Sequence, residues 1–84
     1  MIIYSVTLDL TLVIGRLKSF RLAEFNSLCP TVFTEADNPD DACYFTMCKF
    51  SETILKQKET ASTAILLKDI LHDVRITRVR PRDA

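Results

Sequence analysis

A chain of 84 residues has room for one domain and one hydrophobic core, and chains of this size often gain stability by self-association. Hydrophobic residues make up 48% of the sequence and charged residues 26%, which is typical of a folded domain and excludes a disordered chain. The formal net charge is zero, so no overall basic charge attracts nucleic acid or membranes, although a local basic patch still could.

The N-terminal segment and the cysteines bear on where the protein works. No basic stretch precedes the first apolar residues, and no run approaches the ~20 apolar residues of a membrane-spanning helix. The three cysteines, Cys29, Cys43 and Cys48, are an odd and sparse set, which indicates reduced thiols. We therefore expect a cytoplasmic protein that does not associate with membranes.

The first half of the chain predicts a strand, a helix and a second strand. Residues 2–14 alternate between an apolar side and a largely hydroxylated side, which predicts one long strand. From 16 to 28 the apolar residues recur at helical spacing and predict a helix, which Pro30 ends. Residues 31–34 are β-branched and aromatic and predict a short strand.

The middle of the chain predicts a connector and a third strand. Residues 35–41 contain Asn38-Pro39 among acidic residues, which is typical of a turn. Residues 42–50 predict a strand that is apolar on both sides and antiparallel to the strand before it. An apolar second side indicates either a central position in the sheet or an interface.

From Ser51, a suitable N-cap, to His72 the sequence predicts a second helix. The apolar residues of its two halves fall on different sides of a straight helix, and the segment Thr60–Thr63 between them favours capping over helix interior. We expect a break near Thr60–Thr63. The alternative is one continuous helix that contacts the sheet on one side and a partner on the other.

Residues 73–82 predict a last strand, with a bulge because Val79 falls out of phase with Val74 and Ile76. The resulting order β-α-β-β-α-β, in a single domain over residues 1–84, predicts a ferredoxin-like α+β fold with an antiparallel sheet and its helices on one face. The first strand would be central, with its hydroxylated side open. Many unrelated functions use this fold, so the fold alone predicts none.

Candidate catalytic and metal-binding groups are few. A single glycine excludes a P-loop or a dinucleotide-binding loop. His72 is the only histidine, and near a helix C-terminus a cation simply complements the helix dipole. The spacing of the cysteines and His72 is unlike that of zinc sites, and the acids of 35–41 lack an EF-hand pattern. We expect no catalytic residue, no metal and no cofactor, hence a protein that is not an enzyme.

An excess of apolar surface predicts a protein-interaction module. The residues expected to contact a partner are Tyr44, Phe45, Met47, Ile54 and Leu55. The expected partners are a second copy of the chain, forming a homodimer, and an unidentified protein. The small size and the lack of motifs are typical of accessory or inhibitory proteins such as those of phages. The alternative is a compact core with a few exposed apolar residues, which is common.

Two further functions remain open. Four arginines within eight positions could bind nucleic-acid phosphates, or could simply protect an edge strand from aggregation: Arg75, Arg78, Arg80 and Arg82. An RNA-reading sheet also needs an aromatic residue on its open side, which Tyr44 or Phe45 would supply. The hydroxyl row Ser5, Thr7 and Thr11 could instead bind a small ligand or nucleotide at a subunit interface.

Overall fold

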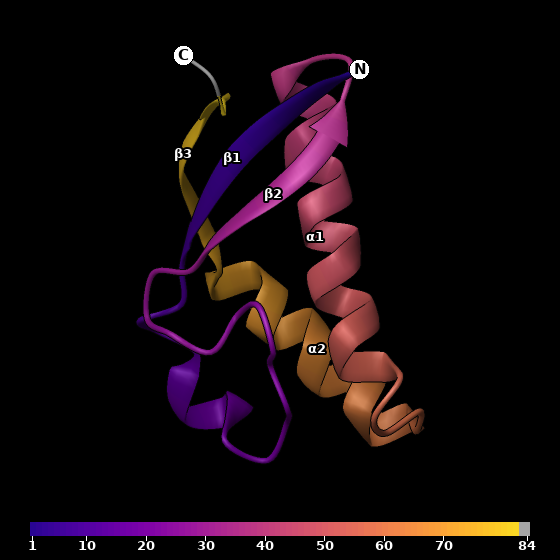
Figure 1. The fold of residues 1–84 in the computed structure, drawn as a ribbon. Coiled ribbons are helices and arrows are strands. Elements are labelled where there is room, and N and C mark those ends of the chain that lie inside the picture. The colour runs from indigo at the N-terminus through magenta and orange to yellow at the C-terminus, as the bar shows by residue number, and fades with distance from the viewer. Residues whose placement is uncertain (83–84) are drawn as a thin grey trace.

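The computed structural model describes residues 1–82 as a three-stranded antiparallel sheet with one helix along one face and a second helix packed against the first, near the end of the sheet (Figure 1). The elements are the strands β1 (Ile2–Asp9), β2 (Thr31–Ala36) and β3 (Arg75–Pro81) and the helices α1 (Pro39–Leu55) and α2 (Ala61–Asp73). β1 lies between the other two strands, in the sheet order β2-β1-β3. The protein is therefore an α+β protein with a central first strand, as the sequence predicts.

The ferredoxin-like prediction is wrong beyond this class. Within the described residues the sheet has three strands, whereas the ferredoxin-like motif has four. The short 3-10 helix η1 (Ile14–Leu17) follows β1, and the two α-helices follow one another without a strand between them. Both differences arise in two segments, 16–28 and 42–50, whose secondary structure was predicted wrongly.

The segment 42–50, predicted as a strand, belongs to α1. Asn38 is the N-cap, and its side-chain oxygen accepts a hydrogen bond from the backbone N–H of Asp41 at 2.9 Å. Pro39 occupies the first turn, where its missing N–H costs nothing, and acidic residues complement the helix dipole there. The predicted connector is thus a helix start, and 42–50 is apolar on several sides because it is a helix pressed against a sheet.

One row of residues, spaced four apart, packs α1 onto the sheet: Ala42, Thr46, Phe50 and Ile54. Thr46 is the polar member of this row. Its hydroxyl donates to the carbonyl of Ala42 at 2.8 Å and accepts from the hydroxyl of Thr34 on β2 at 2.9 Å. A buried hydroxyl is therefore fully partnered, and it ties α1 to β2.

The helix predicted over 16–28 is absent, because the chain makes successive tight turns instead. The backbone N–H groups of Phe20 and Phe25 each donate to a carbonyl three residues back, those of Leu17 and Leu22, at 3.0 Å. The turns bury all four of these side chains in the core. A single short helix is only marginally stable in isolation, so burial of four large apolar groups decides the backbone path.

Side chains from α1 and the residues after it hold this irregular segment in place. The amide oxygen of Gln57 accepts from the backbone N–H of Arg21 at 2.7 Å, and the amide nitrogen donates to the Arg21 carbonyl at 2.6 Å. Lys49 forms an ion pair with Glu24 at 2.6 Å. The segment is therefore fixed against α1 without regular structure of its own.

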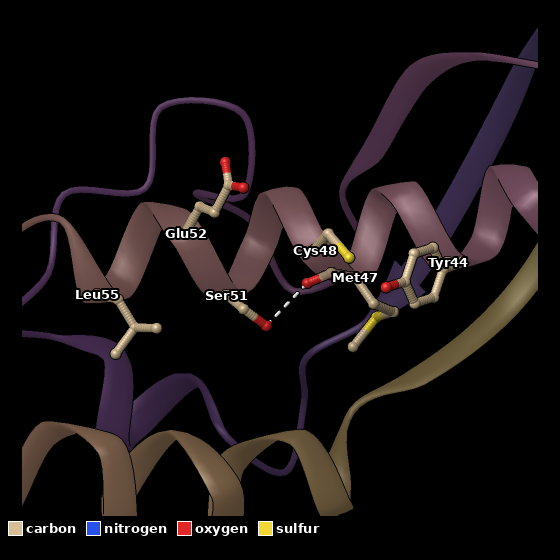
Figure 2. A pocket seen from close by; sticks show the side chains of 6 residues that line it. All are labelled: Tyr44, Met47, Cys48, Ser51, Glu52 and Leu55. Carbon is tan, nitrogen blue, oxygen red and sulfur yellow. Dashed lines mark hydrogen bonds between the residues drawn. The ribbon is translucent and has the colours of Figure 1, made fainter.

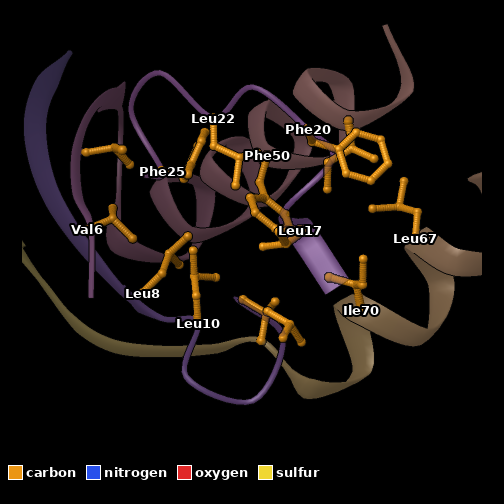
Figure 3. Close-up of a cluster of buried hydrophobic side chains, with 14 of the residues drawn as sticks. Val6, Leu8, Leu10, Leu17, Phe20, Leu22, Phe25, Phe50, Leu67 and Ile70 are labelled. Atoms are coloured by element: carbon orange, nitrogen blue, oxygen red, sulfur yellow. The ribbon is translucent and has the colours of Figure 1, made fainter. Parts of the chain in front are cut away.

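The core fills the space between the even-numbered side of β1 and the helices (Figure 3). Phe25 and Phe50 meet edge to face, with ring centroids 5.2 Å apart, in the geometry that aromatic pairs favour. Other core side chains include Val6, Leu8, Leu10, Leu17, Leu67 and Ile70. The apolar side predicted for the first strand is confirmed from Tyr4 to Leu10. The strand predicted over 2–14 is too long, because β1 ends at Asp9 and the chain then turns, which exposes Leu12 and buries Val13.

The break predicted near Thr60–Thr63 is also confirmed. α1 ends at Leu55, and α2 begins after Thr60, whose hydroxyl accepts a hydrogen bond from the backbone N–H of Thr63 at 3.1 Å. Ser51, predicted as an N-cap, instead lies inside α1, where its hydroxyl donates to the Met47 carbonyl at 2.9 Å. The capping chemistry therefore lies at Asn38 and Thr60.

Candidate functional site

A bulge in β3 decides where its arginines lie. The pairing with β1 shifts register between Thr7 and Leu8, which leaves Thr77 as an extra residue on β3. The Thr77 hydroxyl donates to the Thr7 carbonyl at 3.3 Å. The extra residue corrects the phase of the strand, so that Ile76 and Val79 both pack against the core. The bulge that the sequence predicts is therefore confirmed.

The same bulge brings all four arginines to one side of the sheet. We call this side, which faces away from the helices, the open face. The cross-strand neighbours on it are Asp9 with Arg75, Thr7 with Arg78, and Ser5 with Arg80. The backbone N–H of Arg82 donates to the Ile3 carbonyl at 2.8 Å, which continues the pairing. In an unbulged strand with strict alternation, Arg75 would face opposite to Arg78.

β2 adds an aromatic residue to the open face. Phe33 lies opposite Ser5 and leaves 55% of its surface exposed. The guanidinium carbon of Arg82 lies 4.8 Å from the centroid of the Phe33 ring, within cation–π distance. Arg82 therefore reaches from the end of β3 across β1 to β2. Phe33, Ser5 and Arg80 form one row across the sheet.

The hydroxyl groups of the open face lie between the aromatic ring and the arginines. The hydroxyls of Thr7 and Thr31 share a hydrogen bond of 2.8 Å, and Ser5 is half-buried. Thr11 lies beyond the end of β1, and its hydroxyl and backbone N–H both donate to the Asp9 carboxylate, at 2.5 and 2.9 Å. These two bonds, the hydroxyl's first, lower the pKa of Asp9 below its ordinary value.

The open face is positive although the chain as a whole is neutral. Its four arginines stand against the two carboxylates of Asp9 and Glu35. Within residues 1–82, none of these arginines takes part in an ion pair, and the carboxylate of Asp9 is engaged with Thr11 instead. The guanidinium groups are therefore available to an external anion.

The residues predicted to contact a partner all belong to α1, but only some of them lie at its surface. A shallow depression of about 300 Å³, the α1 depression, runs along this helix (Figure 2). It is lined by Tyr44, Met47, Cys48, Ser51, Glu52 and Leu55. Tyr44 is 66% exposed, whereas Phe45 is exposed but does not line the depression. Ile54 is fully buried and belongs to the core rather than to this surface.

His72 lies at the end of α2 beside a surface ion pair. Arg16 pairs with Asp73 at 2.7 Å, and the His72 ring nitrogen lies 3.5 Å from the same carboxylate. The hydrogen bond from Arg16 and then that from His72 lower the pKa of Asp73 below its ordinary value. This pair joins the end of α2 to η1. It presents no nucleophile, so the arrangement fits a structural role.

Among residues 1–82, no three histidine, cysteine or carboxylate side chains gather into a cluster that could hold a metal ion. Neither of the two α-helices described there has the length and apolar character needed to cross a membrane.

Compared with known proteins, the chain matches no family model, no curated protein and no solved structure.

Sequence reasoning found the arginines and the hydroxyls of the open face but not its aromatic residue. Tyr44 and Phe45, considered for that role, lie on α1, which covers the opposite side of the sheet. Phe33 takes the position instead. The available signal was the alternation in 31–35, which separates Phe33 from the buried Val32. Assigning it to the open face requires the register between β1 and β2.

Proposed function

We propose that the protein is a non-enzymatic nucleic-acid-binding module whose open face contacts phosphates. The observation that carries the proposal is the bulge at Thr77, which places four arginines on one side of the sheet. A guanidinium group donates two parallel hydrogen bonds to phosphate oxygens, so a line of unpaired arginines suits a polymer of phosphates. A cytoplasmic location is part of the proposal, and the three free thiols support it.

Protection of an edge strand is the simpler explanation of these arginines. That role needs charges along the strand, but it sets no requirement for the side of the sheet on which they lie. In β3 the positions between the arginines are apolar and half-buried at Ile76 and Val79. All four of these arginines thus lie on the open face, where Phe33 and three hydroxyl side chains also lie. This arrangement favours a binding surface.

The test compares two charge reversals of equal size. Arg78→Glu with Arg80→Glu changes the open face, and Lys18→Glu with Lys68→Glu makes the same change in net charge at exposed positions elsewhere. Fluorescence anisotropy of a labelled single-stranded oligonucleotide is measured at low salt. We expect the wild type and the lysine variant to bind, and the arginine variant to lose binding. Absence of wild-type binding, or an equal loss in both variants, would contradict the proposal.

The α1 depression supports a second candidate function, self-association or binding of another protein. Its apolar residues Tyr44, Met47, Cys48 and Leu55 follow the spacing of a helical seam, which suits pairing with a second helix. We expect a second copy of the chain as the occupant, and an accessory or inhibitory role would then act through this surface. Light scattering on a sizing column gives the solution mass. Tyr44→Asp should convert a dimer to a monomer, and a wild-type monomer at all concentrations removes self-association as the role of this surface.

A further inference from the structure

We infer that the open face binds single-stranded nucleic acid, with the phosphates along β3 and a base stacked on the pair formed by Phe33 and Arg82. This inference rests on the proposed function and adds the form of the nucleic acid and the place of the base. Three features of the open face carry it: the line of arginines, the exposed aromatic ring and the short side chains between them.

The first feature is the linear spacing of the cations. Arg78 and Arg80 are alternate residues of β3, and Arg82 follows directly after its end with its backbone still bonded to β1, so successive Cα atoms of this line are about 6.7 Å apart. Consecutive phosphates of an extended single strand repeat at a comparable distance, so one strand can follow the line with one phosphate per arginine. The carboxylate of Asp9 lies on β1, opposite Arg75, and that of Glu35 lies on the far strand β2. A single strand on β3 avoids them, whereas a broad duplex would cover them.

The second feature is the exposed ring. Phe33 leaves 55% of its surface accessible, and the guanidinium group of Arg82 packs at 4.8 Å from its centroid. Aromatic rings and guanidinium planes are both surfaces on which unpaired bases stack. The bases of a duplex already stack on one another and are not available to this pair. An exposed ring at the end of an arginine line therefore favours single strands.

The third feature is the surface between the arginines and the ring. Phe33 and Arg80 are separated by the one strand β1, so they lie about 10 Å apart, roughly the reach of one nucleotide from phosphate to base. Ser5 and Thr7 occupy β1 at this place, and Thr31 lies beside Thr7. Their side chains are short, so a sugar can lie close to the sheet, and their hydroxyls can bond to it. A nucleotide thus fits across the sheet from β3 to β2.

The experiment separates base stacking from phosphate binding. Three labelled oligonucleotides of equal length are compared at the same salt: oligothymidine, an abasic strand with the same number of phosphates, and a duplex. The variants are Phe33→Leu, Phe33→Tyr and, as a matched control, Phe45→Leu. Phe45 is 43% exposed and lies on α1, outside both the open face and the α1 depression. Thermal unfolding checks that each variant is folded.

We expect Phe33→Leu to weaken oligothymidine binding roughly tenfold or more, because it removes one stacked base. Phe33→Tyr keeps the ring and should retain affinity, and Phe45→Leu should bind like the wild type. The abasic strand and the duplex should bind the wild type more weakly than oligothymidine, and Phe33→Leu should not weaken the abasic strand further. The abasic comparison uses the wild type, so it decides the question even where a variant fails to fold.

Three results overturn the inference while the proposed function stands. They are equal binding of the abasic strand and oligothymidine, duplex binding as tight as that of oligothymidine or tighter, and an unchanged affinity of a folded Phe33→Leu variant for oligothymidine. Failure of the wild type to bind any of the three at low salt overturns the proposed function itself.

Discussion

Replacement of Arg80 by Gln gives the most quantitative test of the open face. Arg80 is exposed and lies at the β3 end of the row that it forms with Ser5 and Phe33. If the four arginines each neutralise one phosphate of a single strand, the logarithm of the binding constant falls with the logarithm of salt at a slope of about −2.8. The affinity then falls about 50-fold between about 50 and 200 mM salt. With one arginine fewer, the slope becomes about −2.1 and the fall about 20-fold.

The assay is a set of anisotropy titrations with one labelled oligonucleotide across that salt range. Arg21→Gln is the matched control, since it makes the same chemical change at an exposed residue of the segment after η1, away from the open face. We expect the control to keep the wild-type slope. If Arg80→Gln keeps that slope, or if Arg21→Gln lowers it by the same amount, Arg80 does not contact a phosphate.

Three further predictions concern the fold. Thr46→Val and Thr34→Val each break the hydroxyl pair between α1 and β2 and should cost about 1 kcal/mol of unfolding free energy, a fall in Tm of about 4–8 °C. The double variant should recover most of that loss, because neither hydroxyl is then left without its partner. Asn38→Ala removes the N-cap of α1 and should lower the free energy of unfolding by about 1 kcal/mol. The pKa of Asp73 is lowered in the fold, so its stabilising effect is present above about pH 4 and is lost as pH falls through the lowered value. Asp73→Asn should therefore be less stable than the wild type at neutral pH and approach it in acid.

Denaturant unfolding measures all three predictions, the last of them at pH 7 and in acid. An additive double variant would show that Thr46 and Thr34 do not interact. Asn26→Ala, in the irregular segment, is the control for the cap, and an equal loss there would remove the capping explanation. A difference between wild type and Asp73→Asn that grows in acid would contradict the sign of the shift, and with it the role of the Arg16 contact.

The sequence predicts the central strand β1 and the edge strand β3 well, because their patterns are local. Alternation over 2–14 identifies β1 and its buried side, and the phase error at Val79 identifies the bulge of β3. The break near Thr60 is equally local, since threonine at an N-cap satisfies a free backbone N–H within its own helix. The hydrogen bond that caps α2 joins residues three positions apart, and the buried side of each strand follows from alternation along that strand.

Two segments were predicted wrongly for opposite reasons. In 42–50 the local signal was present and misread, because Asn38, Pro39 and the acids after them start a helix as readily as they make a turn. In 16–28 the local signal was itself misleading. Its apolar residues do share a helical face, but packing against Phe50 and the rest of the core favours turns. No pattern within the segment contains that information.

The candidate site likewise combines features that the sequence shows with features that only the folded sheet shows. The arginines and hydroxyls are visible in the sequence, whereas their common side depends on the pairing of β1 with both neighbours. Phe33 and Arg82 are 49 positions apart along the chain, yet their side chains touch across β1. A site built across three strands is therefore assembled by register, which a single sequence specifies only through the completed sheet.

The amide of Gln57 has a consequence for the order in which the chain folds. Its two hydrogen bonds join residues 36 positions apart. The amide accepts from the N–H of Arg21 and donates to the carbonyl of Arg21, as the backbone of a neighbouring strand would. During synthesis the segment between β1 and β2 leaves the ribosome long before this amide does. Its four large apolar side chains then remain exposed to solvent until α1 has been completed. The segment between β1 and β2 can thus take its final form only after α1 and Gln57 have been made, although it is itself made earlier.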